Sequence, residues 1–186
     1  AARGNYRRGD CRVTRRHIAF SCQGATLWGT LDCAALHGPT GLLIVSGGNE
    51  IRSGAFAGAA HLAADLAQDA GIPVFRYDRR GIGDSEGNNA GWRGSAEDIA
   101  AALAAFRSAM PGMRRVIGYG LCDGAAALML HGAGLDGLVL ANPWTFESDD
   151  APEHSASDLR RRYWQKLRDP RAVARLLSGR VNLLKL

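Results

Sequence analysis

The sequence has no long hydrophobic run. Its uninterrupted apolar stretches, such as 42–45 and 138–141, are short, whereas a membrane-spanning helix needs about 20 apolar residues. The arginine-rich N-terminus also lacks the apolar core and the small-residue cleavage site of a secretory signal peptide. We therefore expect no membrane span and a cytoplasmic location.

The sequence has only four cysteines, and they are not arranged in closely spaced pairs. The four cysteines do not show the short, repeated spacings of a metal site, and a disulfide framework is not expected in a cytosolic chain. Small buried thiols are the simplest interpretation of Cys22 and Cys33. No metal or other cofactor is predicted.

Neither sign of charge dominates the whole chain. Residues 1–16 hold six arginines and one acid, residues 17–158 hold eight basic and sixteen acidic residues, and residues 159–186 hold nine basic residues and one acid. The net charge of +5 is thus a sum of unlike segments and does not indicate a nucleic-acid partner. Residues 1–12 show no periodicity and are interpreted as a disordered tail or upstream sequence.

Strands and helices are predicted to alternate along the rest of the chain. Residues 17–22 and 26–33 predict an antiparallel hairpin at a sheet edge, with Thr30 and Asp32 on a wet face. Further strands are expected within 41–48, 72–78, 114–120 and 135–144, and helices within 59–70, 95–110 and 123–131, the second begun by a capping box of Ser95 and Asp98. This order predicts an α/β core over residues 13–146 with a mostly parallel sheet. Residues 147–186 predict a loop and cap-like helices.

A cysteine stands between two glycines at the end of one predicted strand. The stretch "GYGLCDG" has the spacing Gly120-x-Cys122-x-Gly124, the cysteine form of the G-x-S-x-G nucleophile elbow. Glycines suit these positions because a side chain there would clash when the chain turns sharply from strand to helix. The pattern predicts that Cys122 is a nucleophile; a buried cysteine in a tight turn is the alternative.

Another loop has the residues of an oxyanion hole. "SGGNE" follows the first parallel strand, where hydrolases of this type place a backbone N–H donor. Gly48 and Asn49 are the candidates there, and the N–H of Asp123, which follows the nucleophile, is the second donor. An ordinary strand-to-helix turn is the alternative for Asn49.

Five segments together resemble the exosortase A system-associated hydrolase 1 family: "LLIVSGGNEIRSG", "YDRRGIGDSEG", "GLCDGAA", "LVLANPW" and "LLSGRVNL". The resemblance implies an α/β-hydrolase fold, a cysteine nucleophile at Cys122, and a link to bacterial exopolysaccharide production and protein sorting. The expected chemistry is hydrolysis or transfer of an ester, thioester or related acyl bond in a small-molecule substrate. Arg52 is a candidate for holding an anionic substrate group, or else a surface arginine. Trp144 is a candidate for the pocket wall, or else a core residue.

A complete catalytic triad is not expected within the chain. Hydrolases of this fold follow the nucleophile with an acid and then a histidine, on loops after later strands, and the resemblance implies that both follow Leu186. The truncated chain is therefore expected to react slowly or to be inactive. His154, near several acids, is the candidate for a substitute base. Because the strand within 135–142 would lack its neighbour, we also expect self-association through an exposed sheet edge.

Two other classes of protein remain as alternatives. "LLIVSGG" with a following helix and Asp78 resembles part of a Rossmann-type NAD(P)-binding oxidoreductase, although the glycines miss the G-x-G-x-x-G spacing. A non-catalytic binding protein, either a decayed hydrolase or a basic module using 160–162, is the other alternative.

Overall fold

A computed structural model describes residues 13–144 of the chain. The expectations for residues 1–12, for the cap-like segment 147–186 and for His154 lie outside this range. The described elements are, in chain order, β1 (Thr14–Cys22), β2 (Ala25–Cys33), β3 (Thr40–Val45), α1 (Gly58–Ala70), β4 (Val74–Tyr77), α2 (Ala96–Ala109), β5 (Arg115–Leu121), α3 (Asp123–His131) and β6 (Gly137–Ala141), with short 3₁₀ turns at Ala55–Ala57 and Gly132–Gly134. None of the helices in this range is long and apolar enough to cross a membrane.

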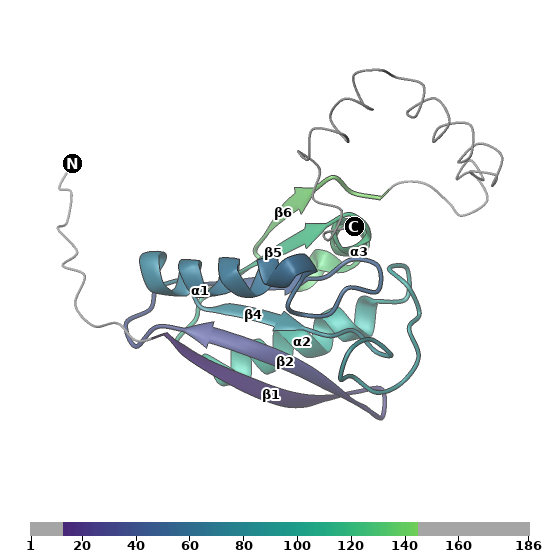
Figure 1. The fold of residues 1–186 in the computed structure, drawn as a ribbon, viewed down its shortest axis with the longest axis horizontal. Helices are drawn as coiled ribbons and strands as arrows, with labels where there is room; N and C mark the ends of the chain where they lie inside the picture. Colours follow the sequence, from purple (N-terminus) through teal and green to yellow (C-terminus); the bar gives the residue numbers. More distant parts are fainter. Residues whose placement is uncertain (1–12, 145–186) are drawn as a thin grey trace, which may run out of the picture. The chain divides into compact units, whose positions relative to one another are not determined.

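The six strands form one sheet in the order β1-β2-β4-β3-β5-β6 (Figure 1). β3 pairs in parallel with β4 and β5, and β6 in parallel with β5, whereas β2 is antiparallel to both β1 and β4. The predicted α/β fold with an antiparallel N-terminal hairpin is confirmed. Because β3, β4 and β5 run in parallel, the loops that follow them leave the same end of the sheet.

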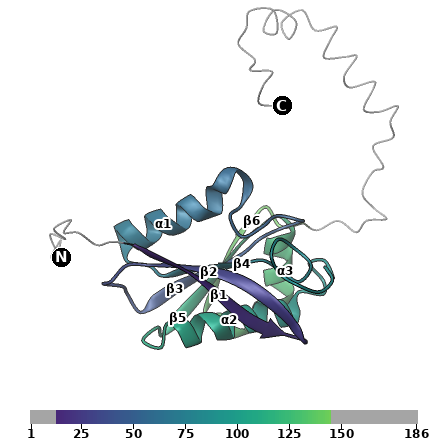
Figure 2. The same cartoon turned by 60° about the horizontal axis from the view of Figure 1, so that its bottom comes forward.

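Helices cover both faces of the sheet. Ile44 and Val74 pack with Ala63 of α1 on one face, whereas Leu43 and Phe75 belong to a larger core with Phe106 of α2 and Leu128 of α3 on the other. Figure 2 shows α1 and α2 on opposite sides of the strands. α1 buries Ala60, Ala63 and Ala67 and leaves Leu62 37% exposed. The loops at the strand ends are held from both sides.

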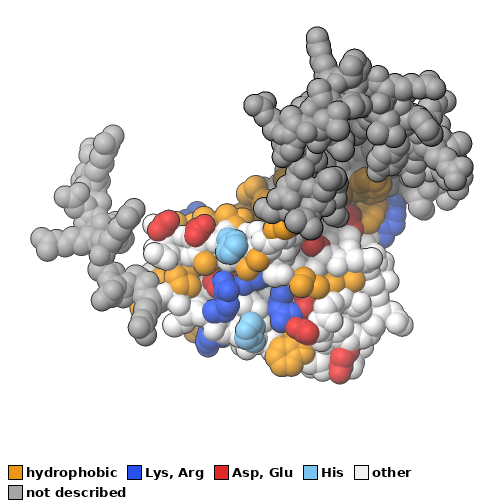
Figure 3. Space-filling view, viewed as in Figure 1, with side chains coloured by type: hydrophobic (Ala, Val, Ile, Leu, Met, Phe, Trp, Pro, Cys, Tyr) orange, Lys and Arg blue, Asp and Glu red, His pale blue; other side chains and the backbone are white. Residues whose placement is uncertain are grey.

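The hairpin differs from the prediction on one face. Thr30 and Asp32 were expected to face water, but they are 2% and 0% exposed. Asp32 accepts hydrogen bonds from the buried guanidinium of Arg76 and from Arg15, with Nη2 of Arg76 at 2.8 Å and Nε of Arg15 at 2.6 Å. The expectation of a wet face was wrong at these positions because the polar side chains are paired under α1, and a paired carboxylate can be buried. Figure 3 shows arginine and acidic side chains close together on this side of the molecule.

The start of α2 also differs. Ser95 makes no side-chain cap of the helix; its hydroxyl donates to the Gly91 carbonyl at 2.8 Å. Asp98 instead accepts from the backbone N–H of Arg80 at 3.0 Å and pairs with the Arg80 guanidinium. The predicted capping box is therefore wrong, because both side chains are used to hold the loop after β4.

β6 forms one edge of the described sheet, and its side chains are only partly covered by the residues described. Leu138, Val139 and Leu140 are 41%, 51% and 37% exposed in this part of the chain. Apolar side chains on an unpaired strand favour association. The expectation of self-association stays a prediction.

Candidate active site

Cys122 lies at a sharp turn from β5 into α3. Its backbone has φ 56° and ψ −124°, a strained conformation for any residue other than glycine. A Cβ atom on Gly120 would lie 2.6 Å from backbone atoms of Gly124, and one on Gly124 would lie 2.4 Å from the Val45 carbonyl oxygen. The two glycines are thus required by close backbone approach, as the elbow spacing predicts.

The backbone around Cys122 is held on both sides. Its N–H donates to the Ala141 carbonyl at 3.0 Å, and its own carbonyl accepts from the N–H of Trp144 at 3.1 Å. The same carbonyl accepts from the first turn of α3. These bonds fix the strained residue against the end of β6, so the thiol position is set by two adjacent strands.

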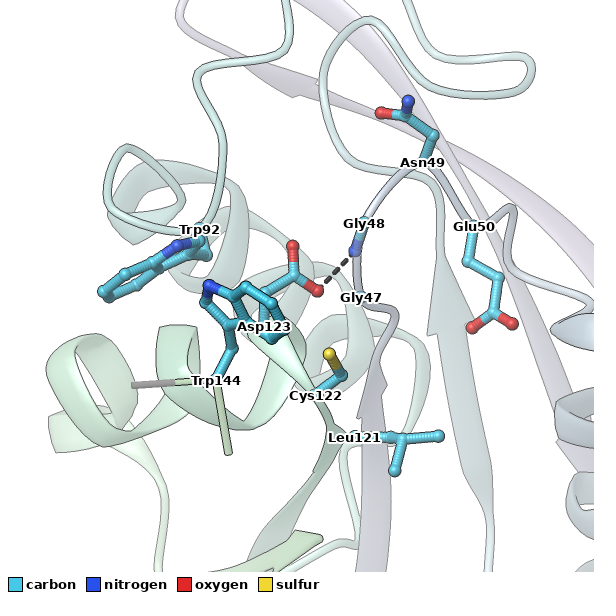
Figure 4. Close-up of a pocket in the computed structure, with 9 residues that line it drawn as sticks. All are labelled: Gly47, Gly48, Asn49, Glu50, Trp92, Leu121, Cys122, Asp123 and Trp144. Atoms are coloured by element: carbon cyan, nitrogen blue, oxygen red, sulfur yellow. Dashed lines mark hydrogen bonds between the residues drawn. The ribbon is translucent and has the colours of Figure 1, made fainter. Parts of the chain in front are cut away.

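The thiol opens into a cavity of about 530 Å³, within the range of small-molecule sites. Figure 4 shows the sulfur pointing toward the space below the loop 47–50, with Trp92 and Trp144 on the other side. The lining residues come from the β3 loop, the loop after β4, the elbow and the end of β6: Gly47, Gly48, Asn49, Glu50, Trp92, Leu121, Cys122, Asp123 and Trp144.

The carboxylate of Asp123 links the elbow to the β3 loop. It accepts a very short hydrogen bond from the N–H of Gly48, and its second oxygen lies 3.8 Å from Nη2 of Arg79. The Arg79 guanidinium, which is 2% exposed, donates to the Gly48 carbonyl and to the Ser95 hydroxyl. Gly48 is therefore held through both its N–H and its carbonyl by charged side chains.

The three predicted oxyanion donors differ in whether their N–H group already has an acceptor. The N–H of Gly48 is used by Asp123. The backbone N–H groups of Asn49 and Asp123 have no hydrogen-bond acceptor within residues 13–144, and both residues line the cavity. The arrangement brings all three predicted residues to the thiol, and their role as an oxyanion hole stays a prediction.

Arg52 lies outside the Cys122 cavity. Its guanidinium pairs with Asp78 and with Asp84, the latter at 2.7 Å, and it lines a second cavity of about 420 Å³ with His17 and Trp28. Its charge is therefore balanced by two carboxylates. The prediction that Arg52 holds an anionic substrate group is not supported by this placement, whereas Trp144 does line the cavity as predicted.

No histidine lines the cavity in the described range. His17 contacts the Thr30 hydroxyl, His37 contacts the neighbouring Gly38 carbonyl, and His131 contacts the Arg93 carbonyl at 2.9 Å. His61 is exposed on α1.

The two other cysteines of the described range are buried, at 5% exposure for Cys22 and 8% for Cys33. Burial, with a smaller contribution from the nearby Asp98 carboxylate, raises the pKa of the Cys22 thiol to about 11. Because the thiolate is the reactive form, Cys22 is chemically protected. Cys122, which is partly exposed, differs from both.

Sequence reasoning did not single out three residues of the site. Trp92 lies in the glycine-rich loop after β4, Glu50 follows the predicted oxyanion residues, and Arg79 follows Asp78. Only their position after strands that end at the same edge of the sheet indicates a site. Their side-chain directions depend on how the loops pack.

The model of the alpha/beta hydrolase family matches residues 36–184. Among solved structures, the alpha/beta hydrolase GrgF from Penicillium sp. sh18 is 26% identical with a TM-score of 0.63, over 83% of this chain and 54% of that one. The Pyrococcus furiosus esterase Pf2001 is 17% identical with a TM-score of 0.61, over 75% and 55%. XC6422 from Xanthomonas campestris, described as an a/b serine hydrolase without lid, is 19% identical with a TM-score of 0.58, over 72% and 65%.

The comparison with curated proteins finds no match. The chain spans about half the length of the first two of these solved structures. The hydrolase fold is favoured over the Rossmann alternative, because the family match covers most of the chain and the solved hydrolases match its fold with TM-scores of about 0.6. The chain belongs to the alpha/beta hydrolase family.

Proposed function

We propose that Cys122 is the nucleophile of a hydrolase or acyltransferase that acts on an ester, thioester or related acyl bond. The observation that carries this proposal is the strained elbow, which exposes a thiol in a cavity at the carboxyl ends of the parallel strands. Strain of this kind is found where a side chain must be presented to a substrate.

The reaction follows from the geometry of the cavity. The sulfur attacks the carbonyl carbon, and the carbonyl oxygen becomes an oxyanion that the N–H groups of Asn49 and Asp123 can stabilise, joined by Gly48 if the Asp123 carboxylate moves away. The carbon–oxygen or carbon–sulfur bond to the leaving group then breaks, and the leaving group takes up a proton. Water hydrolyses the resulting thioester and returns the thiol.

A thiol nucleophile of this kind uses a histidine as base and acid, oriented by a carboxylate. His154, which lies outside the described residues, is the candidate for such a base within the given sequence. The resemblance to the exosortase A-associated family extends the proposal to a role beside exopolysaccharide production. A small-molecule acyl substrate and a cytoplasmic location are further parts of the proposal. Because no histidine of the described range lines the cavity, the 186-residue chain should acylate Cys122 and release the acyl group slowly.

The test is trapping of the acyl group. The 186-residue chain is mixed with p-nitrophenyl acetate, and mass spectrometry after proteolysis locates the added acetyl group. We expect one acetyl group on Cys122 in the native chain and none at the corresponding peptide in Cys122→Ala. Acetylation spread over Cys11, Cys22 and Cys33, without preference for Cys122, would contradict the proposal.

Alkylation by iodoacetamide provides a second readout. Burial and the raised pKa of Cys22 leave about one thiol in a thousand ionised at pH 8, and Cys33 is buried as well. We expect Cys122 to be modified before both in the folded chain, and all cysteines to react at similar rates in urea. Faster labelling of Cys22 or Cys33 in the folded chain would argue for a purely structural Cys122.

A further inference from the structure

The wall of the Cys122 cavity carries two tryptophans from separate parts of the chain. Trp92 comes from the loop between β4 and α2, and Trp144 follows β6. Figure 4 shows both indoles on the same side of the sulfur, facing the space opposite the loop 47–50. A substrate bonded at the sulfur would therefore have one polar wall of backbone amides and one aromatic wall.

Both indoles are held in place. The backbone N–H of Trp144 donates to the carbonyl of Cys122 at 3.1 Å, so its location is tied directly to the nucleophile. The guanidinium of Arg93 lies 4.2 Å from the centre of the Trp92 ring, a cation–π contact that orients the indole. Trp92 also packs against the main hydrophobic core. Trp144 keeps 42% of its surface exposed in the described part, which leaves indole surface for a ligand.

The charges of the cavity are unsuited to an anion. Glu50 and Asp123 line it, and no lysine or arginine is among its lining residues in the described range. The Asp123 carboxylate lies near the buried guanidinium of Arg79, and the Glu50 carboxylate accepts a hydrogen bond from the backbone N–H of Ala55 at 2.8 Å. A negatively charged acyl group would therefore find no cationic side chain among the lining residues to pair with, in a cavity that two acidic residues line.

We propose that this site selects an aromatic acyl group that carries no negative charge, with Trp92 and Trp144 as the residues that determine this specificity. Flat rings stack or pack edge-on against indoles with a gain beyond their buried area, and the cavity volume of about 530 Å³ accommodates an aryl acyl group. The inference rests on the proposed acylation of Cys122.

The test compares three p-nitrophenyl esters that share one leaving group: those of 3-phenylpropanoic acid, hexanoic acid and glutaric acid, the last with a free carboxylate. The rate of acylation of the 186-residue chain is divided by the rate for N-acetylcysteine, which removes the intrinsic reactivity of each ester. We expect the normalised rate for the phenylpropanoate to be about tenfold above that for the hexanoate, and the glutarate to be slowest.

Variants identify the source of the preference. Trp144→Ala and Trp92→Ala should each reduce the aromatic preference severalfold, whereas Trp144→Phe should retain most of it. Trp144→Leu keeps apolar volume without a ring and serves if the alanine variant does not fold. Trp28→Ala removes a tryptophan that lies outside this cavity and should leave the preference unchanged.

The outcomes separate the two proposals. If no ester acylates Cys122, the proposed function is wrong. If all three acylate Cys122 at equal normalised rates, or if the aromatic preference survives the loss of both rings, the proposed function stands and the inference on specificity is overturned. A glutarate ester that reacts as fast as the phenylpropanoate would also overturn it.

Discussion

The carboxylate of Asp123 accepts the backbone N–H of Gly48, so the residue after the proposed nucleophile occupies a donor of the loop that faces it. The same carboxylate lies near the buried guanidinium of Arg79. A donor that already serves a carboxylate cannot also stabilise an oxyanion, and a fixed negative charge beside the thiol opposes the build-up of a second one.

We therefore predict that Asp123→Ala speeds acylation relative to alkylation. Alkylation by iodoacetamide forms no oxyanion, so the ratio of the acylation rate with p-nitrophenyl acetate to the alkylation rate reports the donors alone. We expect this ratio to rise about tenfold, because one more N–H becomes available. Both rates are followed at Cys122 by mass spectrometry.

Two further variants control that measurement. Asp123→Asn keeps an oxygen that can accept from Gly48 and removes the charge, so its ratio should rise less. Asp69→Ala makes the same change of charge at an exposed position on α1 and should leave the ratio unchanged. A fall of the ratio in Asp123→Ala would mean that the carboxylate holds the loop 47–50 in the position needed for acylation, and does not merely block the Gly48 N–H.

The strained backbone at Cys122 should lower the free energy of unfolding of variants that keep a side chain there. The residue has φ 56° and ψ −124°, which costs about 1–3 kcal/mol for a non-glycine residue, whereas glycine loses about 0.5–1 kcal/mol through its greater freedom in the unfolded chain. We predict that Cys122→Gly is more stable than Cys122→Ala by about 1 kcal/mol, measured by urea unfolding.

The matched control is Ala104→Gly at an exposed position of α2, where the same change should reduce the free energy of unfolding by about 1 kcal/mol. If Cys122→Gly proves less stable than Cys122→Ala by a similar amount, the turn at Cys122 is not strained.

Gly124 should be among the least replaceable residues of the fold. A methyl group there would lie 2.4 Å from the Val45 carbonyl oxygen. Relieving this clash would require the backbone of β3 and of the elbow to move apart. We predict that Gly124→Ala reduces the free energy of unfolding by about 3 kcal/mol or prevents folding.

Gly58 provides the comparison for this variant. It lies at the start of α1 with helical φ −60° and has open space around its Cα, so Gly58→Ala should be neutral or stabilising by up to about 1 kcal/mol. Thermal unfolding followed by circular dichroism distinguishes the two substitutions. Equal melting temperatures for Gly124→Ala and Gly58→Ala would contradict the conclusion that close backbone approach requires glycine at position 124.

Alkaline pH should destabilise the fold through Cys22. Its pKa is raised from about 9 to about 11, chiefly by burial. In the pH range between these values the unfolded chain loses the thiol proton while the folded chain retains it. This contribution to stability is therefore complete below pH 9 and is lost as the pH rises toward 11.

The measurement is the urea midpoint between pH 7 and pH 10.5, and Cys22→Ala should flatten its decline. Some decline should remain in that variant, because burial also raises the pKa of Tyr77. Identical pH profiles for the native chain and Cys22→Ala would show that Cys22 titrates normally in the folded state.

Several features could be predicted from the sequence because they depend on neighbouring residues. The apolar periodicities located the strands and helices, and the helix predicted over 123–131 begins and ends at those residues. The elbow followed from the spacing of Gly120, Cys122 and Gly124, since a side chain at 120 would clash with the backbone of Gly124, four residues away, although the clash at 124 is with Val45 of another strand.

The partners of the polar side chains were decided only by the tertiary structure. Thr30 and Asp32 were expected in water, and Ser95 and Asp98 in a capping box, but each finds partners on other elements. Local pattern cannot distinguish an exposed polar residue from one that meets an opposite charge across the sheet.

The sequence by itself determined the sheet, its helices and the turn that presents Cys122, because steric limits and hydrophobic periodicity act over a few residues. The tertiary structure alone brought Asp123 to Gly48, 75 residues away, placed Trp92 beside Trp144 at the cavity, and set Arg52 against two carboxylates. Those contacts join loops that meet only where parallel strands end together, so their geometry depends on the packing of the whole sheet.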